Sequence, residues 1–125
     1  MIIDTTVWVH FFRKDEKASV FLLNLKDEIV VSRITVMEIV YGRKSKKDVI
    51  NMWKQFRNLS VKVQDIDRHI SVKAGEIFEK HFPTQGIGLL DTFIAATALE
   101  NHTILATHNI KHFKFIKGLE LIIPY

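Results

Sequence analysis

The sequence has 125 residues, of which 47% are apolar, and its 18 Lys and Arg against 14 Asp and Glu give a formal net charge of +4. It contains no cysteine, which excludes disulfides, thiolate metal sites and cysteine nucleophiles and leaves oxygen or histidine as metal ligands. No apolar stretch approaches the roughly 20 residues that span a bilayer, and Asp4 interrupts the apolar start, unlike the leader of a secreted protein. We therefore expect a single globular domain over residues 1–125, located in the cytoplasm.

The predicted elements alternate between short strands and helices. In chain order, residues 1–3 predict a strand, 5–12 and 16–25 helices, 28–32 a strand, 35–41 and 46–59 helices, 61–63 a strand and 67–81 a helix. Residues 83–88, with one proline and two glycines, predict a loop, before a helix at 89–101, a strand at 103–106, a helical turn at 109–113 and a last strand at 120–123. This alternation predicts an α/β fold of three layers, in which helices cover both faces of a central, mostly parallel sheet.

Asp4 directly follows the first predicted strand. It therefore lies at the carboxyl edge of the sheet, where open α/β sheets bind their ligands. An unpaired charge is costly to bury, so we interpret Asp4 as a functional acid and ask which other acids can converge on it.

Two helical acids are the candidates. Glu38 is the only acid in the apolar helix of residues 35–41, but Thr35, Glu38 and Gly42 form a polar stripe of the kind that usually faces water. Asp91 begins the helix of residues 89–101, where helix capping alone favours an acid. It also shares a face with small apolar residues and points along the sheet edge towards Asp4. Both interpretations stay open for each acid.

Asn109 follows the fourth predicted strand, again at the carboxyl edge. A turn made by Asn109 would explain its position; the functional alternative is a hydrogen bond or a water-mediated contact to a metal. His108 and His112 flank it and are candidate general bases, although surface histidines beside a turn usually have no such role.

Four segments that contain these residues occur in order along the chain. They are Ile3-Asp-Thr-Thr-Val-Trp8, Thr35-Val-Met-Glu-Ile-Val-Tyr-Gly42, Leu89-Leu-Asp-Thr-Phe-Ile-Ala-Ala96 and Leu105-Ala-Thr-His-Asn-Ile-Lys-His-Phe113. Together they resemble a PIN-domain ribonuclease, most like the VapC-type toxins of bacterial toxin–antitoxin pairs. The resemblance covers nearly the whole chain.

The resemblance implies that Asp4, Glu38 and Asp91 are the acidic metal-binding triad and that Thr6 assists the site. The family often has a fourth acid where this chain has Asn109, which offers an oxygen without a charge, so a second metal ion would bind weakly or not at all. Three carboxylates suit Mg²⁺ or Mn²⁺, which can activate water and neutralise a phosphoryl oxygen.

We therefore hypothesise a metal-dependent endoribonuclease, a hydrolase of RNA phosphodiester bonds. In it Asp4 and Asp91 hold the principal ion, Glu38 orients water or a second ion, and Thr6 and Asn109 give polar support. A basic run is predicted to attract the RNA backbone: Arg43, Lys44, Lys46 and Lys47.

The resemblance also implies partners: a cognate antitoxin, a second copy in a homodimer, and transfer RNA as the favoured substrate. Part of an aromatic cluster is expected to serve these surfaces, namely Trp8, Phe11, Phe12 and Phe21 with Trp53 and Phe56. Two other functions fit part of the pattern. A dehalogenase-like phosphatase needs a second aspartate where Thr6 stands, which argues against it. A PIN-fold module that binds RNA or protein without cutting stays open.

Overall fold

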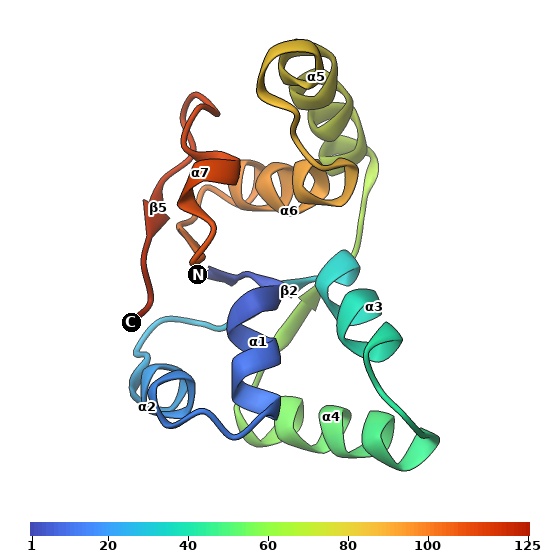
Figure 1. The fold of residues 1–125 in the computed structure, drawn as a ribbon, viewed down its shortest axis with the longest axis vertical. Coiled ribbons are helices and arrows are strands. Elements are labelled where there is room, and N and C mark those ends of the chain that lie inside the picture. The colour runs from blue at the N-terminus through green and yellow to red at the C-terminus, as the bar shows by residue number, and fades with distance from the viewer.

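In the computed structural model, which describes residues 1–125, five short strands form one parallel sheet between two layers of helices (Figure 1). The strand order is β3-β2-β1-β4-β5. The strands are β1 (Ile2–Ile3), β2 (Val30–Ser32), β3 (Lys62–Gln64), β4 (Leu105–Ala106) and β5 (Leu121–Ile122). The predicted three-layer α/β fold is confirmed, with a sheet that is wholly parallel.

Seven helices connect and cover the strands: α1 (Thr5–Phe12), α2 (Glu16–Asn24), α3 (Arg33–Tyr41), α4 (Lys46–Asn58), α5 (Arg68–Gln85), α6 (Leu89–Glu100) and α7 (Ile110–Phe113). Figure 1 shows α1, α2 and α4 on one side of the sheet and α5, α6 and α7 on the other, with α3 beside its edge. None of these helices combines the length and the apolar character needed to cross a bilayer.

Each face of the sheet carries its own apolar core. Ile2 packs with α5, α6 and α7 in one core, and the next residue, Ile3, packs with α1, α2, α3 and α4 in the other. Successive residues of a strand point to opposite faces, so a strand covered on both sides must be apolar throughout. This requirement explains the short, unbroken apolar runs of the sequence.

The aromatic cluster of the early helices is mainly part of this packing. Trp8 is fully buried, and its ring centroid lies 4.8 Å from that of the buried Phe56. The expectation that Phe56 serves a partner surface is therefore wrong, because a core side chain has no area left to offer. Phe21 and Trp53 are only partly buried.

Polar side chains at the helix starts explain why the helices begin where they do. Asp15, Ser32, Ser45 and Asp67 each accept a hydrogen bond from a backbone N–H of the first turn that follows. Such N-caps satisfy donors that the helix itself leaves free.

The loop predicted at residues 83–88 is wrong over its first half, because α5 continues to Gln85. Pro83 lies in the last turn of the helix, where its missing N–H removes a single hydrogen bond. Gly86, with φ of 62°, adopts the left-handed conformation that terminates the helix. The glycine ends the helix, and the proline does not.

The order of the strands defines one special place in the sheet. From β1 the chain adds β2 and then β3 on one side, after which α5 and α6 carry it back to β4 on the other side of β1. Helices therefore diverge above and below the sheet at the boundary between β1 and β4. In open α/β sheets, ligands bind at such a switch point, outside the carboxyl ends of the strands.

Candidate active site at the switch point of the sheet

Asp4 lies at this switch point, directly after β1, and is only 3% exposed. One carboxylate oxygen accepts the backbone N–H of Thr5 at 2.8 Å. The other accepts the hydroxyls of Thr6 at 3.0 Å and Thr107 at 2.8 Å. Three donors offset the cost of burying a charge, and they fix the orientation of the carboxylate.

Thr107 provides the contact that joins the ends of β1 and β4. It is buried, donates to Asp4, and accepts the backbone N–H of Asn109 at 2.9 Å. The sequence interpretation assigned no role to this residue. The signal was present, however, because Thr107 follows β4 as directly as Asp4 follows β1.

Glu38 reaches the same region from α3. Its carboxylate accepts the hydroxyl of Thr5 at 2.7 Å, and the hydroxyl of Thr35 lies 3.1 Å from that of Thr5. Thr35 is fully buried and Glu38 is partly buried. The open interpretation of a polar stripe facing water is therefore wrong for both residues; only Gly42 is exposed.

Asp91 lies in the first turn of α6, with 29% of its side chain exposed. A Cβ at Gly88 would lie 3.2 Å from an oxygen of this carboxylate, so the glycine leaves the space that Asp91 occupies. The imidazole Nδ1 of His112, on α7, lies 3.4 Å from Asp91. Of the two candidate histidines, His112 thus contacts the acids, whereas His108 packs against the rings of His10 and Tyr125.

The acids influence each other's protonation. Burial raises the pKa of Glu38 above its ordinary value; the Thr5 hydrogen bond opposes this, and the charges of Asp4 and Asp91 add to it. Burial likewise raises the pKa of Asp91, the charge of Asp4 adds to it, and His112 opposes it. Both groups are therefore held in a place where their charged forms are disfavoured.

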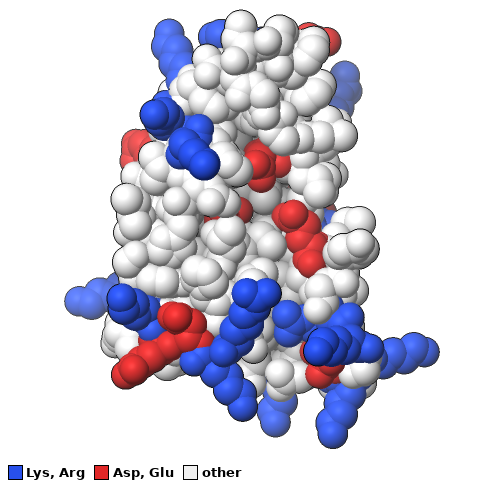
Figure 2. Space-filling view, viewed as in Figure 1, with Lys and Arg blue, Asp and Glu red and all other residues white.

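One cavity of about 220 Å³ unites the predicted site residues. We call it the acidic cavity; among its lining residues are Asp4, Thr6, Glu38, Asp91 and Asn109, together with His10. The side chain of Asn109 makes no capping bond to α7, so its amide is free for the cavity. Figure 2 shows acidic atoms between the two helical layers on the face that it presents.

The donor set of this cavity fits a hard divalent cation. Its acids and amide offer oxygen ligands, which Mg²⁺ and Mn²⁺ prefer. Burial raises the pKa of Glu38 and of Asp91, and neighbouring acids add to it, so a bound cation would favour the charged forms of both. No three acidic or histidine side chains stand in a geometry ready to hold an ion. The carboxylates would therefore have to draw together around a cation.

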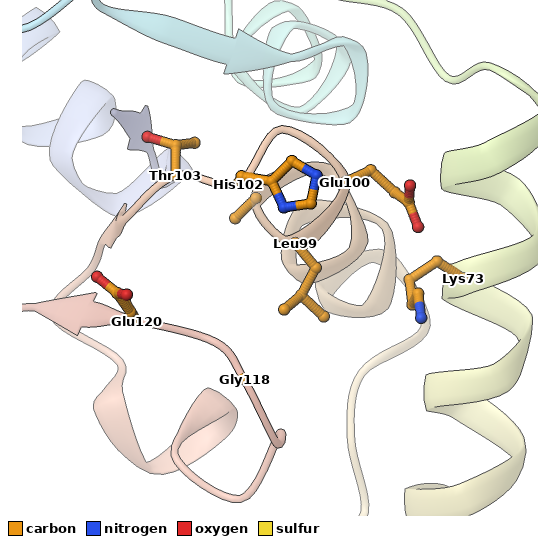
Figure 3. A pocket seen from close by; sticks show the side chains of 8 residues that line it. Lys73, Leu99, Glu100, His102, Thr103, Gly118 and Glu120 are labelled. Atoms are coloured by element: carbon orange, nitrogen blue, oxygen red, sulfur yellow. The ribbon is translucent and has the colours of Figure 1, made fainter.

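A second cavity, of about 400 Å³, lies at the opposite edge of the sheet, before β4 and β5. Figure 3 shows its two acids, Glu100 and Glu120, on opposite sides of the space with His102 between them. Its acids do not converge, and the edge is the one at which α/β sheets rarely bind ligands. The acidic cavity is therefore the candidate functional site.

Fold and site together define a parallel α/β domain with an acidic, oxygen-lined ligand site at its switch point. The family model of the PIN domain matches residues 1–118, and the chain belongs to this family. A comparison with curated proteins gives no match.

Solved structures of similar fold are toxin–antitoxin complexes. A toxin–antitoxin complex from Klebsiella pneumoniae has a TM-score of 0.78 at 25% identity, covering 99% of this chain and 97% of that chain. VapBC2 from Rickettsia felis, bound to a DNA fragment from its promoter, has a TM-score of 0.75 at 29% identity, covering 97% of this chain and 96% of that chain. DNA-bound VapBC from Salmonella typhimurium has a TM-score of 0.80 at 25% identity, covering 99% and 97%.

We predict that two matched substitutions change stability in opposite directions. Asp91→Asn removes a disfavoured charge, so in chelator at neutral pH it should raise the melting temperature. Asp4→Asn disturbs a carboxylate with three donors and should lower the unfolding free energy by about 1–3 kcal/mol. Because the folded pKa of Asp91 is raised, the gain from Asp91→Asn should fade as the pH falls through that pKa and wild-type Asp91 becomes protonated.

Thermal unfolding followed by circular dichroism between neutral and mildly acidic pH measures both effects. If the two variants shifted the melting temperature in the same direction, it would be wrong that the charge of Asp4 is stabilised by its donors while that of Asp91 is disfavoured.

Proposed function

We propose that this protein is a metal-dependent endoribonuclease and the toxin of a VapBC-type toxin–antitoxin pair. One observation carries the proposal: Asp4, Glu38 and Asp91, from three separate elements, line one cavity at the switch point of a PIN-family domain. Glu38 and Asp91 have raised pKa values, and buried acids with perturbed pKa values beside one cavity are often functional.

Each residue of the acidic cavity has a separate role in this proposal. Asp4 and Asp91 would hold Mg²⁺ or Mn²⁺, which when bound supplies an activated water and neutralises phosphoryl charge. Thr6 and Thr107 keep the Asp4 carboxylate in one orientation through their hydrogen bonds. Glu38, held by Thr5, orients the attacking water and accepts its proton. Asn109 contributes a neutral oxygen at the side of the cavity.

The toxin assignment is supported by the solved neighbours, which are toxin–antitoxin complexes. We propose accordingly that this chain binds a cognate antitoxin, forms a homodimer and acts on RNA, with transfer RNA favoured by family analogy and the cytoplasm as its place of action. Exposed apolar side chains on α3 and α6 offer area for a partner: Met37, Tyr41, Leu89 and Leu90.

Cleavage of labelled total RNA tests the nuclease. We predict cutting with Mg²⁺ or Mn²⁺ and none with chelator. Asp91→Asn should lower the rate by more than about a hundredfold, because even the partners of metal ligands contribute about 10–100-fold. Since this variant is expected to be more stable than the wild type, lost activity cannot be attributed to unfolding.

Glu120→Gln, which removes an exposed acid at the opposite edge of the sheet, is the matched control and should cut normally. Activity that survives Asp91→Asn would remove the evidence for the site. Wild-type protein that binds RNA but never cuts it would favour the non-catalytic binding module.

The role of Thr107 is tested by its isostere. Thr107→Val loses the hydrogen bond to Asp4 without changing the shape of the side chain, so we predict about 10–100-fold weaker Mg²⁺ affinity by calorimetry. Thr97→Val is the control, because Thr97 is also buried but donates to the backbone of its own helix. Equal affinities in the two variants would show that Thr107 does not position Asp4 for the metal.

The antitoxin is tested by co-expression with the product of an adjacent small gene. We predict that the two proteins purify together and that the complex cuts RNA more slowly than the free chain. Absence of a complex would contradict the toxin assignment and leave the nuclease assignment standing.

A further inference from the structure

A third cavity continues the acidic cavity towards the basic side of the molecule. It measures about 530 Å³, lies between the end of α1 and the connection from α3 to α4, and shares Val9 and Glu38 with the acidic cavity. We call it the basic groove, because it is lined by three cations, Arg13, Arg43 and Lys44. The two cavities are therefore neighbours with a common wall at these two residues.

The cations of the groove have no acidic partner. The ion pairs of the structure within 4 Å involve other residues, and none includes Arg13, Arg43 or Lys44. The acids of the groove are Glu38, at the junction with the acidic cavity, and Asp48, in the first turn of α4. Figure 2 shows Lys and Arg gathered below the acidic atoms on the side of α4.

Arg43 is held in place more firmly than its neighbours. Its Nε donates to the carbonyl oxygen of Ile39 at 3.3 Å, and its guanidinium lies 5.0 Å from the ring centroid of Phe12. The terminal nitrogens remain available as a planar fork, the geometry that matches a phosphate. A fixed side chain loses little conformational entropy when it binds.

Lys46 and Lys47 are neither fixed by contacts nor part of the groove. They are exposed at the start of α4 and do not line the groove. Of the basic run expected to attract RNA, Arg43 alone is fixed by contacts, with Ile39 and Phe12. Lys44 lines the groove but is exposed, and the other two can contribute only diffuse attraction.

We infer that the basic groove binds the phosphodiester backbone of the RNA strand next to the bond that is cut, with Arg43 as its fixed phosphate ligand and Arg13 as a second contact. The inference rests on the proposed function and adds the path of the substrate. A strand in the groove passes Glu38 and enters the acidic cavity, because the two share that side chain. Repulsion by the acids is offset on this side, where Arg13, Arg43 and Lys44 have no acidic partner within 4 Å.

Binding of a short fluorescein-labelled single-stranded RNA, measured by polarisation in chelator, tests the inference without any cleavage. Arg43→Ala should weaken binding by about tenfold, which corresponds to one good charged contact, and should reduce the slope of log K against log salt by about 0.7. Arg43→Lys should keep the slope but bind more weakly than the wild type, because it retains the charge and loses the fork. Lys47→Ala, from the same basic run, is the control and should change affinity less than about twofold.

Melting temperatures of the variants exclude unfolding as the cause. Equal weakening by Arg43→Ala and Lys47→Ala would mean diffuse attraction and would overturn the inference alone. Wild-type protein with no affinity for RNA would overturn both the inference and the proposed substrate. Loss of binding in Arg43→Ala by a protein that never cuts RNA would uphold the groove and refute the nuclease.

Discussion

The arrangement of the site depends on one buried charge, the carboxylate of Asp4. A carboxylate at the centre of a parallel sheet is tolerable only when donors replace its water, and here the donors come from both sides of the switch point. The start of α1 supplies the N–H of Thr5 and the hydroxyl of Thr6, and the end of β4 supplies Thr107. The Thr107 bond also joins the end of β1 to the end of β4, so one contact both orients the acid and connects the two strands at the switch point.

The other two acids are in the opposite situation. Glu38 has a single hydroxyl donor, and Asp91 has only the imidazole of His112 nearby, so burial and mutual repulsion raise the pKa of each. In natural proteins, local preferences, packing and electrostatics usually all favour the same fold, and the exceptions are found mainly at functional sites. One acid with a full set of donors beside two acids with few donors is the pattern expected of a cation site. In such a site the first acid is a fixed ligand, and a bound cation would draw the other two towards it.

Local patterns in the sequence were enough to predict the elements but not all of their ends. Helical periodicity after Asp4 predicted α1 with its observed bounds, because capping and packing favour the same register there. The sequence predicts an end of α5 that is too early, because proline indicates a helix end wherever it occurs. The free energy that a proline costs a helix depends on how near the helix end it lies. Local patterns in the sequence could not predict which side chains contact each other, because partners such as Thr5 and Glu38 are 33 residues apart. Only the packing of α1 against α3 shows that Thr35 and Glu38 face the site and not the solvent.

Glu38 connects the two halves of the proposed chemistry. It lies at the wall common to the acidic cavity and the basic groove, so the same carboxylate faces repelling acids on one side and unpaired cations on the other. A polyanionic strand cannot approach three acids unless positive charge lies close to its path, because repulsion between like charges is strongest where water is excluded. Separating the two signs between neighbouring cavities would solve this problem in the proposed mechanism. There the cations of the groove would hold the flanking phosphates, and the three acids would be neutralised by the divalent cation that they bind. Glu38 and Arg43 nevertheless have separate partners, because Glu38 accepts from Thr5 and the Nε of Arg43 donates to Ile39, and no ion pair joins the two side chains.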